Sequence, residues 1–344
     1  MYIPHFVQTS VCRVFGSALL SCAILKAETR GFWQATDIGG EQYVAVEQIK
    51  IFYNFNKLTR HESRIELENS RVLMELEIDS SKCYLNKLKI ILSKPVLEIG
   101  NVVHVAVADV TGWLDPILRP DHIAGAGDFK TIILDPASGA QDPESANDLG
   151  TEGKFTYKIA KLAKTTLEAK GFNVFLTRSE TQDASPEEVL NRANAVKDSA
   201  IFIKISFASG PDTTNSIQTY PVARGEGRMK ADQFGLASVA LSTAVHASLI
   251  SSLGRNTSDG GIKRGELNIF SKLKHPAILI EADSMTHPAG SRLIANKTYQ
   301  AAIAAGIADG VKKYQLAISK EEAVPVPVAF DPPVQWMEWP KGTN

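Results

Sequence analysis

Residues 130–143 read KTIILDPASGAQDP, a short apolar strand that runs directly into a loop of small residues. Residues 131–134 have the β-branched, apolar composition of a buried strand, and Asp135-Pro136 ends it. The loop after this strand offers hydroxyl, amide and carboxyl groups but no histidine or cysteine. Since open α/β sheets bind ligands beside the carboxyl ends of their strands, this stretch marks a candidate site.

A helix and then a strand come after the loop. Apolar residues recur at helical spacing over 155–167 and predict one buried face, made of Phe155, Ile159, Leu162, Ala163 and Leu167. Gly171 stands where a helix places its C′ glycine. The segment FNVFLTR (172–178) then has the composition of a strand.

The alternation continues to about Leu316. Ser185-Pro186-Glu187-Glu188 is a capping box with proline at N1, which predicts a helix through about Val196. Strands are expected at 200–206, 216–222 and 276–283, a long helix at 232–253 closed by Gly254, and two C-terminal helices. This pattern predicts an α/β fold, a mixed sheet flanked by helices, over residues 130–316.

The residues before this region are strand-like. Short apolar runs from about Tyr43 to Val110, the first of them YVAVEQIKIFY (43–53), predict a small β-rich domain over residues 36–115. Residues 112–129 have the prolines and glycines of a linker. Residues 317–344 form a proline-rich tail that favours disorder, although Trp336 and Trp339 are candidates for docking on a partner.

The N-terminus has the features of an export signal. Arg13 precedes a short apolar run, and Leu25-Lys26-Ala27 offers a cleavage site, so residues 1–27 are interpreted as a signal peptide. The run is shorter than the about 20 residues of a membrane span, and no transmembrane span is expected in the mature form. The alternative, a lipoprotein anchored at Cys22 in LLSC, ranks lower because the apolar run continues past Cys22. The protein is expected to be exported, periplasmic or associated with the envelope.

Charge and cysteine content exclude several classes. The formal net charge is −1 and becomes −3 once residues 1–27 are removed, so nucleic acid and anionic membrane surfaces are not expected partners. Cys83 would be the only cysteine left, which excludes an internal disulfide and a cysteine-based zinc site.

Several stretches in consistent order resemble the zinc-dependent N-acetylmuramoyl-L-alanine amidases, which cut the amide between the peptidoglycan sugar and its stem peptide. They are TIILDPASGAQDP (131–143), EGKFTYKIA (152–160), GFNVFLTR (171–178), VLNRANAVK (189–197), IFIKISFAS (201–209) and PAILIEADSMTHP (276–288). They correspond to the family's D-P-G-H-G-G-x-D-P loop, its metal-binding Glu, G-[YF]-x-V-x-L-T-R, L-x-x-R-x-x-x-A-N, F-I-S-I-H-F-N-S and P-A-V-L-V-E-x-G-F-x-S-N-P.

The resemblance implies a site that this chain preserves only in part. In the family two histidines and a glutamate hold zinc, whose bound water has a pKa near about 7, and a second glutamate moves the water's proton. Glu152 matches the metal-binding glutamate and Glu281 the catalytic one. Ser138 and Ser206 stand at the two histidine positions, and a neutral hydroxyl is a poor zinc ligand. No cofactor is therefore expected, unless zinc is held by rearranged ligands.

The nearby Ala137 and Ala208 also replace the Gly and Asn of the family pattern. Lys263 and Arg264 match a basic loop of the family and are candidate substrate-binding residues, with an exposed basic turn as the alternative. The stretch 85–110 resembles the small β-rich domain before some bacterial amidase domains, and also the N-terminal-like module of copper amine oxidases. Lys87 stands in it where a hairpin glycine is expected. That domain is a candidate wall-binding or docking module, with a purely structural role as the alternative.

Three functions remain open at this point. The first is a degenerate amidase homologue that binds peptidoglycan or a muropeptide, or regulates another cell-wall hydrolase. The second is an active amidase whose metal is held by Glu152, Glu281 and either His287 or Asp283. The third is a structural envelope scaffold that uses its N-terminal domain and tail.

Overall fold

The computed structural model describes residues 33–124, 126–137, 146–209, 215–222, 233–254, 257–265 and 270–319. The expected signal peptide, with Cys22, lies outside these residues, as do Ser138 and residues 320–344 of the expected tail.

The C-terminal half is the predicted mixed sheet flanked by helices. Its strands follow the order β13-β10-β14-β17-β15-β16, in which β15 runs antiparallel to β17 and the other paired neighbours are parallel. The strands are β10 (Thr131–Pro136), β13 (Asn173–Leu176), β14 (Ala200–Ala208), β15 (Ser216–Pro221), β16 (Ser258–Ile262) and β17 (Ala277–Ser284). A small hairpin, β11 (Ala146–Asn147) with β12 (Gly150–Thr151), precedes the first helix of this half.

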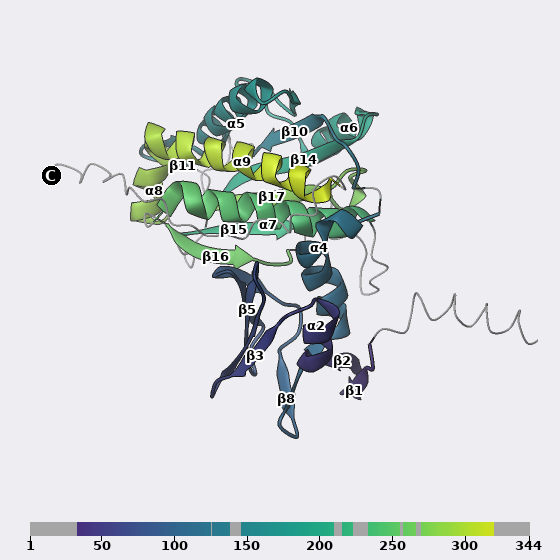
Figure 1. Cartoon of the computed structure of the whole chain (residues 1–344). Coiled ribbons are helices and arrows are strands. Elements are labelled where there is room, and N and C mark those ends of the chain that lie inside the picture. The colour runs from purple at the N-terminus through teal and green to yellow at the C-terminus, as the bar shows by residue number, and fades with distance from the viewer. Residues whose placement is uncertain are drawn as a thin grey trace, which may run out of the picture.

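Helices cover both faces of this sheet. Figure 1 shows three long helices side by side on one face, α5 (Glu152–Ala169), α9 (Lys297–Ile318) and α7 (Gln233–Leu253). Ile132 and Leu134 of β10 pack in the core beneath them, while Ile133 between them joins a second cluster with Val189 of α6. Because successive side chains of β10 point to opposite faces of the sheet, both faces of the strand are buried. The other elements of this half are α6 (Pro186–Ala195), the 3₁₀ turn η5 (Phe270–Lys272) and α8 (Pro288–Ala295).

The start and end signals of the helices were predicted correctly. Ser185 and Glu188 form the reciprocal capping box at the start of α6. Gly171 and Gly254 follow their helices with φ of 89° and 60°, values that favour glycine. One member of the predicted face of α5 was wrong, because Leu162 is 41% exposed whereas the residues at steps of four from Phe155 to Leu167 are buried.

Helix α7 is the core helix of the molecule. Phe234–Leu253 is the one candidate membrane span among the described helices, judged by length and hydropathy alone, and 83% of its apolar window is buried inside the fold. Gly310 of α9 brings the two helices together, because a Cβ there would lie 2.4 Å from the Cα of Val245. The apolar character of α7 is therefore accounted for by packing within the protein.

The N-terminal part contains two groups of antiparallel strands. The separate small sheet has the order β1-β2-β9-β8, and the other strands form a meander from β3 to β7. Their bounds are β1 (Thr36–Ile38), β2 (Glu41–Ala45), β3 (Lys57–Arg60), β4 (Arg64–Glu68), β5 (Leu73–Glu77), β6 (Lys82–Leu85), β7 (Leu88–Ile91), β8 (Leu97–Ile99) and β9 (Val102–Ala106).

Two expectations about this part were wrong. The strand expected across YVAVEQIKIFY gives way at Val46 to helix α2 (Val46–Phe52), which buries Val46 and Ile49 at a helical spacing. The expected linker, 112–129, contains the end of the π-helical turn η1 (Val110–Leu114), α4 (Asp115–Leu118) and the 3₁₀ turn η2 (Pro120–His122), and the short helix α3 (Val107–Asp109) comes just before it. Its prolines occupy the first turns of α4 and η2, where the missing N–H costs nothing, and Trp113 is fully buried.

The two parts of the chain share one sheet. β7 pairs with β16 through Ile90 and Ile262, so the meander extends the C-terminal sheet to eleven strands among the described residues. Val239 and Ala247 of α7 pack into the N-terminal core together with Ile262. The N-terminal part is therefore built onto the edge of the α/β half, as Figure 1 shows below α7.

Candidate functional site

Three strands bring the predicted site residues to one edge of the sheet. Pro136 at the end of β10 pairs with Ile205 of β14, and Ser206, the next residue, pairs with Glu281 of β17. Ala137 continues this arrangement, because its N–H donates to the carbonyl of Ile205 at 2.9 Å. Ser138 lies outside the described residues, so its side chain is not placed.

Glu152 and Ser206 meet directly. Glu152 is the first residue of α5, behind the N-cap Thr151, and is 7% exposed. Its Oε1 accepts hydrogen bonds from the Ser206 hydroxyl and from the Phe207 N–H, both at 2.8 Å. The carboxylate is thereby bound by two donors of β14 and lies at a helix N-terminus, where negative charge is favoured.

These donors do not fit a zinc ion. A zinc site needs lone pairs from imidazole, thiolate or carboxylate groups, but the Ser206 hydroxyl directs its proton at Glu152. No group of three or more His, Cys, Asp or Glu side chains within metal-binding reach occurs among the described residues. Losing outer partners alone commonly costs about 10–100-fold in metal affinity, so replacement of a direct ligand is expected to cost more.

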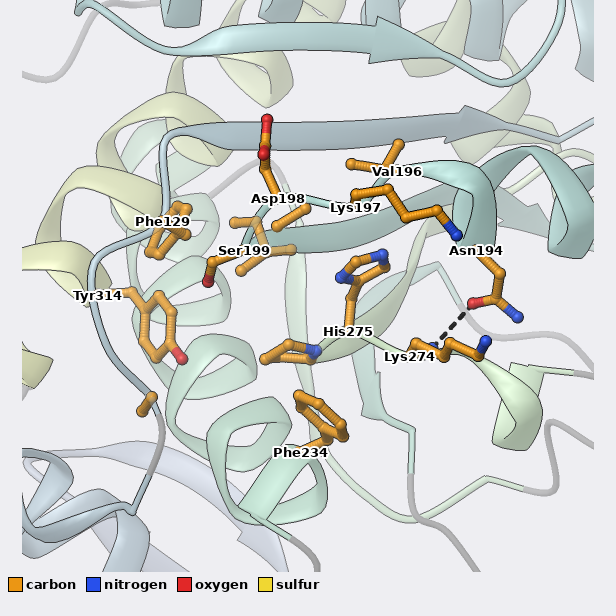
Figure 2. A pocket seen from close by; sticks show the side chains of 14 residues that line it. Phe129, Asn194, Val196, Lys197, Asp198, Ser199, Phe234, Lys274, His275 and Tyr314 are labelled. Carbon is orange, nitrogen blue, oxygen red and sulfur yellow. Dashed lines mark hydrogen bonds between the residues drawn. The ribbon is translucent and has the colours of Figure 1, made fainter.

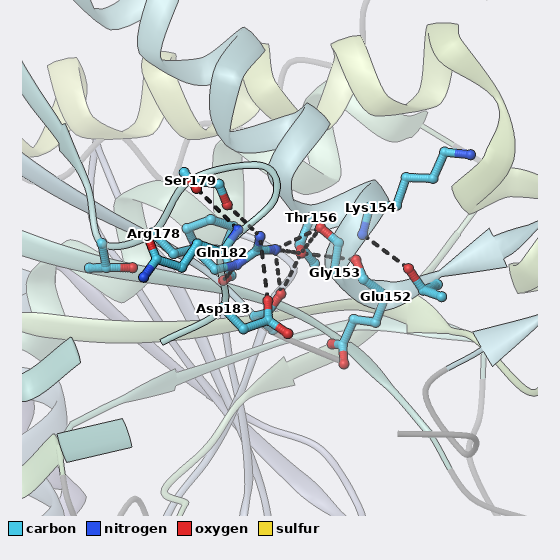
Figure 3. Close-up of polar contacts among 12 residues, drawn as sticks. Glu152, Gly153, Lys154, Thr156, Arg178, Ser179, Gln182 and Asp183 are labelled. Atoms are coloured by element: carbon cyan, nitrogen blue, oxygen red, sulfur yellow. Dashed lines mark hydrogen bonds and ion pairs between the residues drawn. The ribbon is translucent and has the colours of Figure 1, made fainter. Parts of the chain in front are cut away.

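Arg178 fixes the backbone on which this edge is built. Figure 3 shows its guanidinium among the residues around Glu152. It is 5% exposed and donates to the carbonyls of Pro136, Ala137 and Gly153 at 2.9, 2.8 and 2.6 Å. Burial lowers the pKa of Arg178, although the Asp183 carboxylate at 3.8 Å opposes this. The side chain ties the end of β10 to the start of α5.

A second group surrounds Glu281. The half-buried carboxylate accepts a hydrogen bond from the Tyr220 hydroxyl at 2.9 Å, between the antiparallel strands β17 and β15. Burial and the charge of Glu281 raise the pKa of Tyr220, so the phenol stays protonated and remains a donor. The Lys263 ammonium lies 5.5 Å from the centre of the Tyr220 ring. Lys263, a predicted substrate-binding residue, is therefore near Glu281.

Asp135 is bound by neighbouring side chains of the sheet. It is 1% exposed, and its carboxylate accepts from the Lys204 ammonium at 2.8 Å and from the Thr177 hydroxyl. Asp135 and Lys204 lie on the adjacent strands β10 and β14, and Thr177 directly follows β13. The pairing satisfies a carboxylate that would otherwise be buried alone. The carboxyl end of β10 is therefore held by an ion pair, and Asp135 points to Lys204 and Thr177.

The remaining candidates have contacts of their own. Arg264 lies 5.5 Å over the ring of Trp113, in the N-terminal part. His287 is the N-cap residue of α8, and its Nδ1 accepts from the Ala289 N–H at 3.3 Å. Asp283 is fully buried and accepts from the Thr257 hydroxyl at 2.8 Å.

A family model described as N-acetylmuramoyl-L-alanine amidase matches residues 132–313, just over half of the chain. The chain belongs to the N-acetylmuramoyl-L-alanine amidase family. The amidase match contains every strand and helix that carries Glu152, Ser206 and Glu281, and it leaves the N-terminal part outside.

Individual relatives are distant. The Bacillus subtilis (strain 168) protein YqiI is 23% identical over 54% of this chain and 84% of its own length. The N-acetylmuramoyl-L-alanine amidase LytC of the same organism is 26% identical over 54% of this chain but only 35% of its own length. The catalytic domain of CwlV, an amidase from Bacillus (Paenibacillus) polymyxa var. colistinus, is 23% identical with a TM-score of 0.46, covering 56% of this chain and 100% of that domain.

Sequence reasoning missed two residues, Arg178 and Tyr220, that hold the backbone and the carboxylate at this edge of the sheet. Arg178 is the last residue of the stretch that resembles the family's L-T-R strand, but its carbonyl partners are contributed by residues 25 to 42 positions away. Tyr220 falls in an ordinary strand pattern, and only the antiparallel pairing of β15 with β17 brings its hydroxyl to Glu281.

Proposed function

We propose that this protein binds peptidoglycan fragments at the edge of the sheet that carries Glu152 and Glu281, and that it does not hydrolyse them with a zinc-bound water. It would act in the envelope as a binding protein or as a regulator of an active amidase. The observation that supports the proposal is the hydrogen bond from the Ser206 hydroxyl to Glu152. In the family, a histidine and a glutamate at these two positions hold the metal. In this chain the Ser206 hydroxyl at the histidine position donates to the glutamate, Glu152.

The chemistry that remains suits recognition of a peptide. Glu281, Tyr220 and Lys263 place a carboxylate, a phenol and an ammonium within one small region. A stem peptide offers amide N–H groups and carboxylates, which the Glu281 carboxylate and the Lys263 ammonium would bind as acceptor and cation, while the Tyr220 hydroxyl donates to Glu281 and holds that carboxylate in place. Without an activated water, the same groups hold the amide without attacking it.

The N-terminal segment 1–27 supports export of the chain, which would place it where peptidoglycan is found. The N-terminal β-rich part would act with the amidase half as one body, because the two share a sheet. A wall-binding role for that part is a further element of the proposal.

The decisive experiment measures zinc, cleavage and binding on one preparation. We expect the purified chain to sediment with cell walls, to hold much less than one zinc per chain, and to release no stem peptide from muropeptides. Glu281→Gln should weaken wall binding several-fold, whereas Glu168→Gln, on the exposed side of α5, should not. One tightly bound zinc per chain, with cleavage that a chelator abolishes, would establish an active enzyme and refute the proposal. Absence of wall binding would favour a scaffold.

The double substitution Ser138→His and Ser206→His tests the assignment of the two lost ligands. Since the family resemblance assigns both positions to zinc ligands, we expect the variant to take up about one zinc per chain under conditions where the wild type takes up none. Ser138→His alone keeps the Ser206–Glu152 hydrogen bond and serves as the matched control. If the double variant remains free of zinc, the correspondence of these serines to the family's histidines is wrong.

A further inference from the structure

A cavity lies at the end of the sheet opposite to Glu152 and Glu281. It has a volume of about 410 Å³ and includes Ala200 and Ile201, the first residues of β14, and Pro276 just before β17. Ser206 is six residues further along β14, which places it about 20 Å from Ala200. The cavity is therefore separate from the proposed peptidoglycan site, and its occupant can be tested independently of peptidoglycan binding.

The walls of this cavity combine aromatic rings with two lysines. Figure 2 shows Phe129 and Tyr314 together on one side and Lys197 and Lys274 on the opposite side, with Phe234 below. Phe129 and Tyr314 are buried, so their rings form the floor, whereas both lysines are exposed at the rim. Within the described part of the chain, neither lysine is within 4.0 Å of a carboxylate oxygen. Asp198 also lines the cavity, so the two lysines and this carboxylate give the lining a formal net charge of +1, counting His275 as neutral. An apolar group that carries a nearby negative charge matches this lining.

The C-terminal segment begins beside the cavity. Tyr314 belongs to the last turns of α9, which ends at Ile318, and residues 320–344 come after it. Trp336 is 17 residues beyond Ser319, a length of chain that reaches well past the cavity even when it is not fully extended. Closing a loop of this length costs little more than closing one half as long.

The chemistry of that segment complements the cavity. Residues 330–340 read FDPPVQWMEWP, in which Phe330 is followed by Asp331 and Glu338 precedes Trp339. Residues 320–344 contain four acidic and two basic side chains, a net charge of −2. Asp331 and Glu338 are thus each next to an aromatic ring, the combination that the lysines and the aromatic floor accept.

We propose that the cavity holds residues 330–339 of the protein's own C-terminal segment, with an aromatic side chain on the floor and Asp331 or Glu338 against Lys197 and Lys274. An indole ring buries a large apolar area at the cost of ordering only two side-chain torsions, so tryptophan is the best anchor that the segment offers. The contact would join the end of the chain to the amino ends of β14 and β17, and it would leave the opposite edge open.

The test measures the emission of the two tail tryptophans in the full-length chain. The difference between the wild type and Trp336→Phe/Trp339→Phe isolates their signal from Trp33 and Trp113. We expect this signal to be protected from acrylamide, and the charge reversal Lys197→Glu/Lys274→Glu to raise the quenching several-fold. Lys161→Glu/Lys297→Glu, an equal change at exposed positions away from the cavity, should leave the protection intact.

Rescue makes the test specific. Adding Asp331→Lys/Glu338→Lys to the reversed lysines should restore the protection, because the two charges have then exchanged places. Milder Lys197→Gln/Lys274→Gln should release the segment in part and guards against misfolding of the reversed variant. Tail tryptophans as accessible in the wild type as in the reversed variant would overturn the proposal. So would protection that increases with protein concentration, since it would come from a neighbouring copy.

Discussion

At the scale of single residues, Asp283 is the side chain least suited to its surroundings. It stands where the family pattern E-x-G-F has glycine, and its φ of +68° is a conformation that glycine adopts most easily. The residue is fully buried, and within the described part of the chain its Oδ2 has no hydrogen-bond partner. Burial raises the pKa of Asp283 to about 6, against the effect of the hydrogen bond from Thr257.

This raised pKa predicts an unusual pH dependence of stability. Between the ordinary value of 3.8 and about 6, the folded chain holds a proton that the unfolded chain has lost. The contribution of Asp283 to stability is therefore complete below that window and is lost as the pH rises through about 6. Asp283→Asn keeps the shape and removes the titration, so its stability relative to the wild type should rise by about 2–3 kcal/mol from pH 4 to pH 7.

Chemical denaturation at each pH measures this difference. Asp128→Asn, at an exposed position before β10, removes the same charge and should show a flat difference across the window. A flat difference for Asp283→Asn as well would mean that its carboxyl group is not perturbed by burial.

Arg178 makes the opposite case, a buried charge whose partners suit it. The carbonyls of Pro136 and Ala137, at the end of β10, and of Gly153, in the first turn of α5, accept from it. Arg178→Lys cannot reach all of them with one ammonium, so we expect a loss of about 3 kcal/mol of unfolding free energy. Arg192→Lys, at a more exposed arginine that also donates to a carbonyl, should cost less than about 1 kcal/mol. Equal losses in urea titrations of the two variants would remove the distinction.

At the scale of elements, the hairpin between β6 and β7 contains a residue that strains its turn. Asn86 and Lys87 have φ of 47° and 72°, the pair of left-handed residues found in a tight two-residue hairpin. Lysine gains nothing from this conformation, so Lys87→Gly should stabilise the protein by about 1 kcal/mol. Asn86→Gly is the matched control, because it relieves the same backbone but loses the hydrogen bonds to Leu73 and Arg71 at 2.7 and 3.0 Å. Thermal unfolding should place the two variants on opposite sides of the wild type.

How far the elements could be predicted depends on whether their signals are local. The capping box of α6 and the glycines after α5 and α7 were right because each acts within a few residues of sequence. YVAVEQIKIFY was misread because a short apolar run fits a strand or a helix equally well, and the packing of Val46 and Ile49 decides between them. Glu152, Ser206 and Glu281 lie on α5, β14 and β17, which the family motifs also connect, whereas Tyr220 depends on an antiparallel pairing that no local pattern reveals.

At the scale of the whole molecule, the junction between the two parts rests on a partly buried carboxylate. Asp259 of β16 accepts from His246 of α7 at 2.9 Å and from the Gly261 N–H at 2.7 Å, and its other oxygen accepts from the Lys89 N–H of β7 at 3.1 Å. His246 in turn contacts the Thr219 hydroxyl at 2.8 Å, next to Tyr220 on β15. One carboxylate thus connects the N-terminal meander to the strand that supports Glu281.

This junction predicts that the two parts unfold together. Burial alone would raise the pKa of Asp259, but the hydrogen bond and the charge of His246 outweigh burial, and the pKa is lowered. Asp259 therefore stabilises the fold at neutral pH, and this contribution is lost as the pH falls through the lowered pKa. Asp259→Ala leaves His246 and the Lys89 N–H without their acceptor, which should cost about 3 kcal/mol. Glu168→Ala, which breaks an exposed pair on α5, should cost at most about 0.5 kcal/mol.

Calorimetry distinguishes a shared core from two independent ones. Because Val239, Ala247 and Ile262 belong to the N-terminal core, the wild type should give one transition, and Asp259→Ala should shift that whole transition to lower temperature. Two transitions in the wild type, with only one of them moved by the substitution, would show that the sheet across β7 and β16 does not couple the parts. In that case a ligand on the N-terminal part could not influence Glu281 through β15.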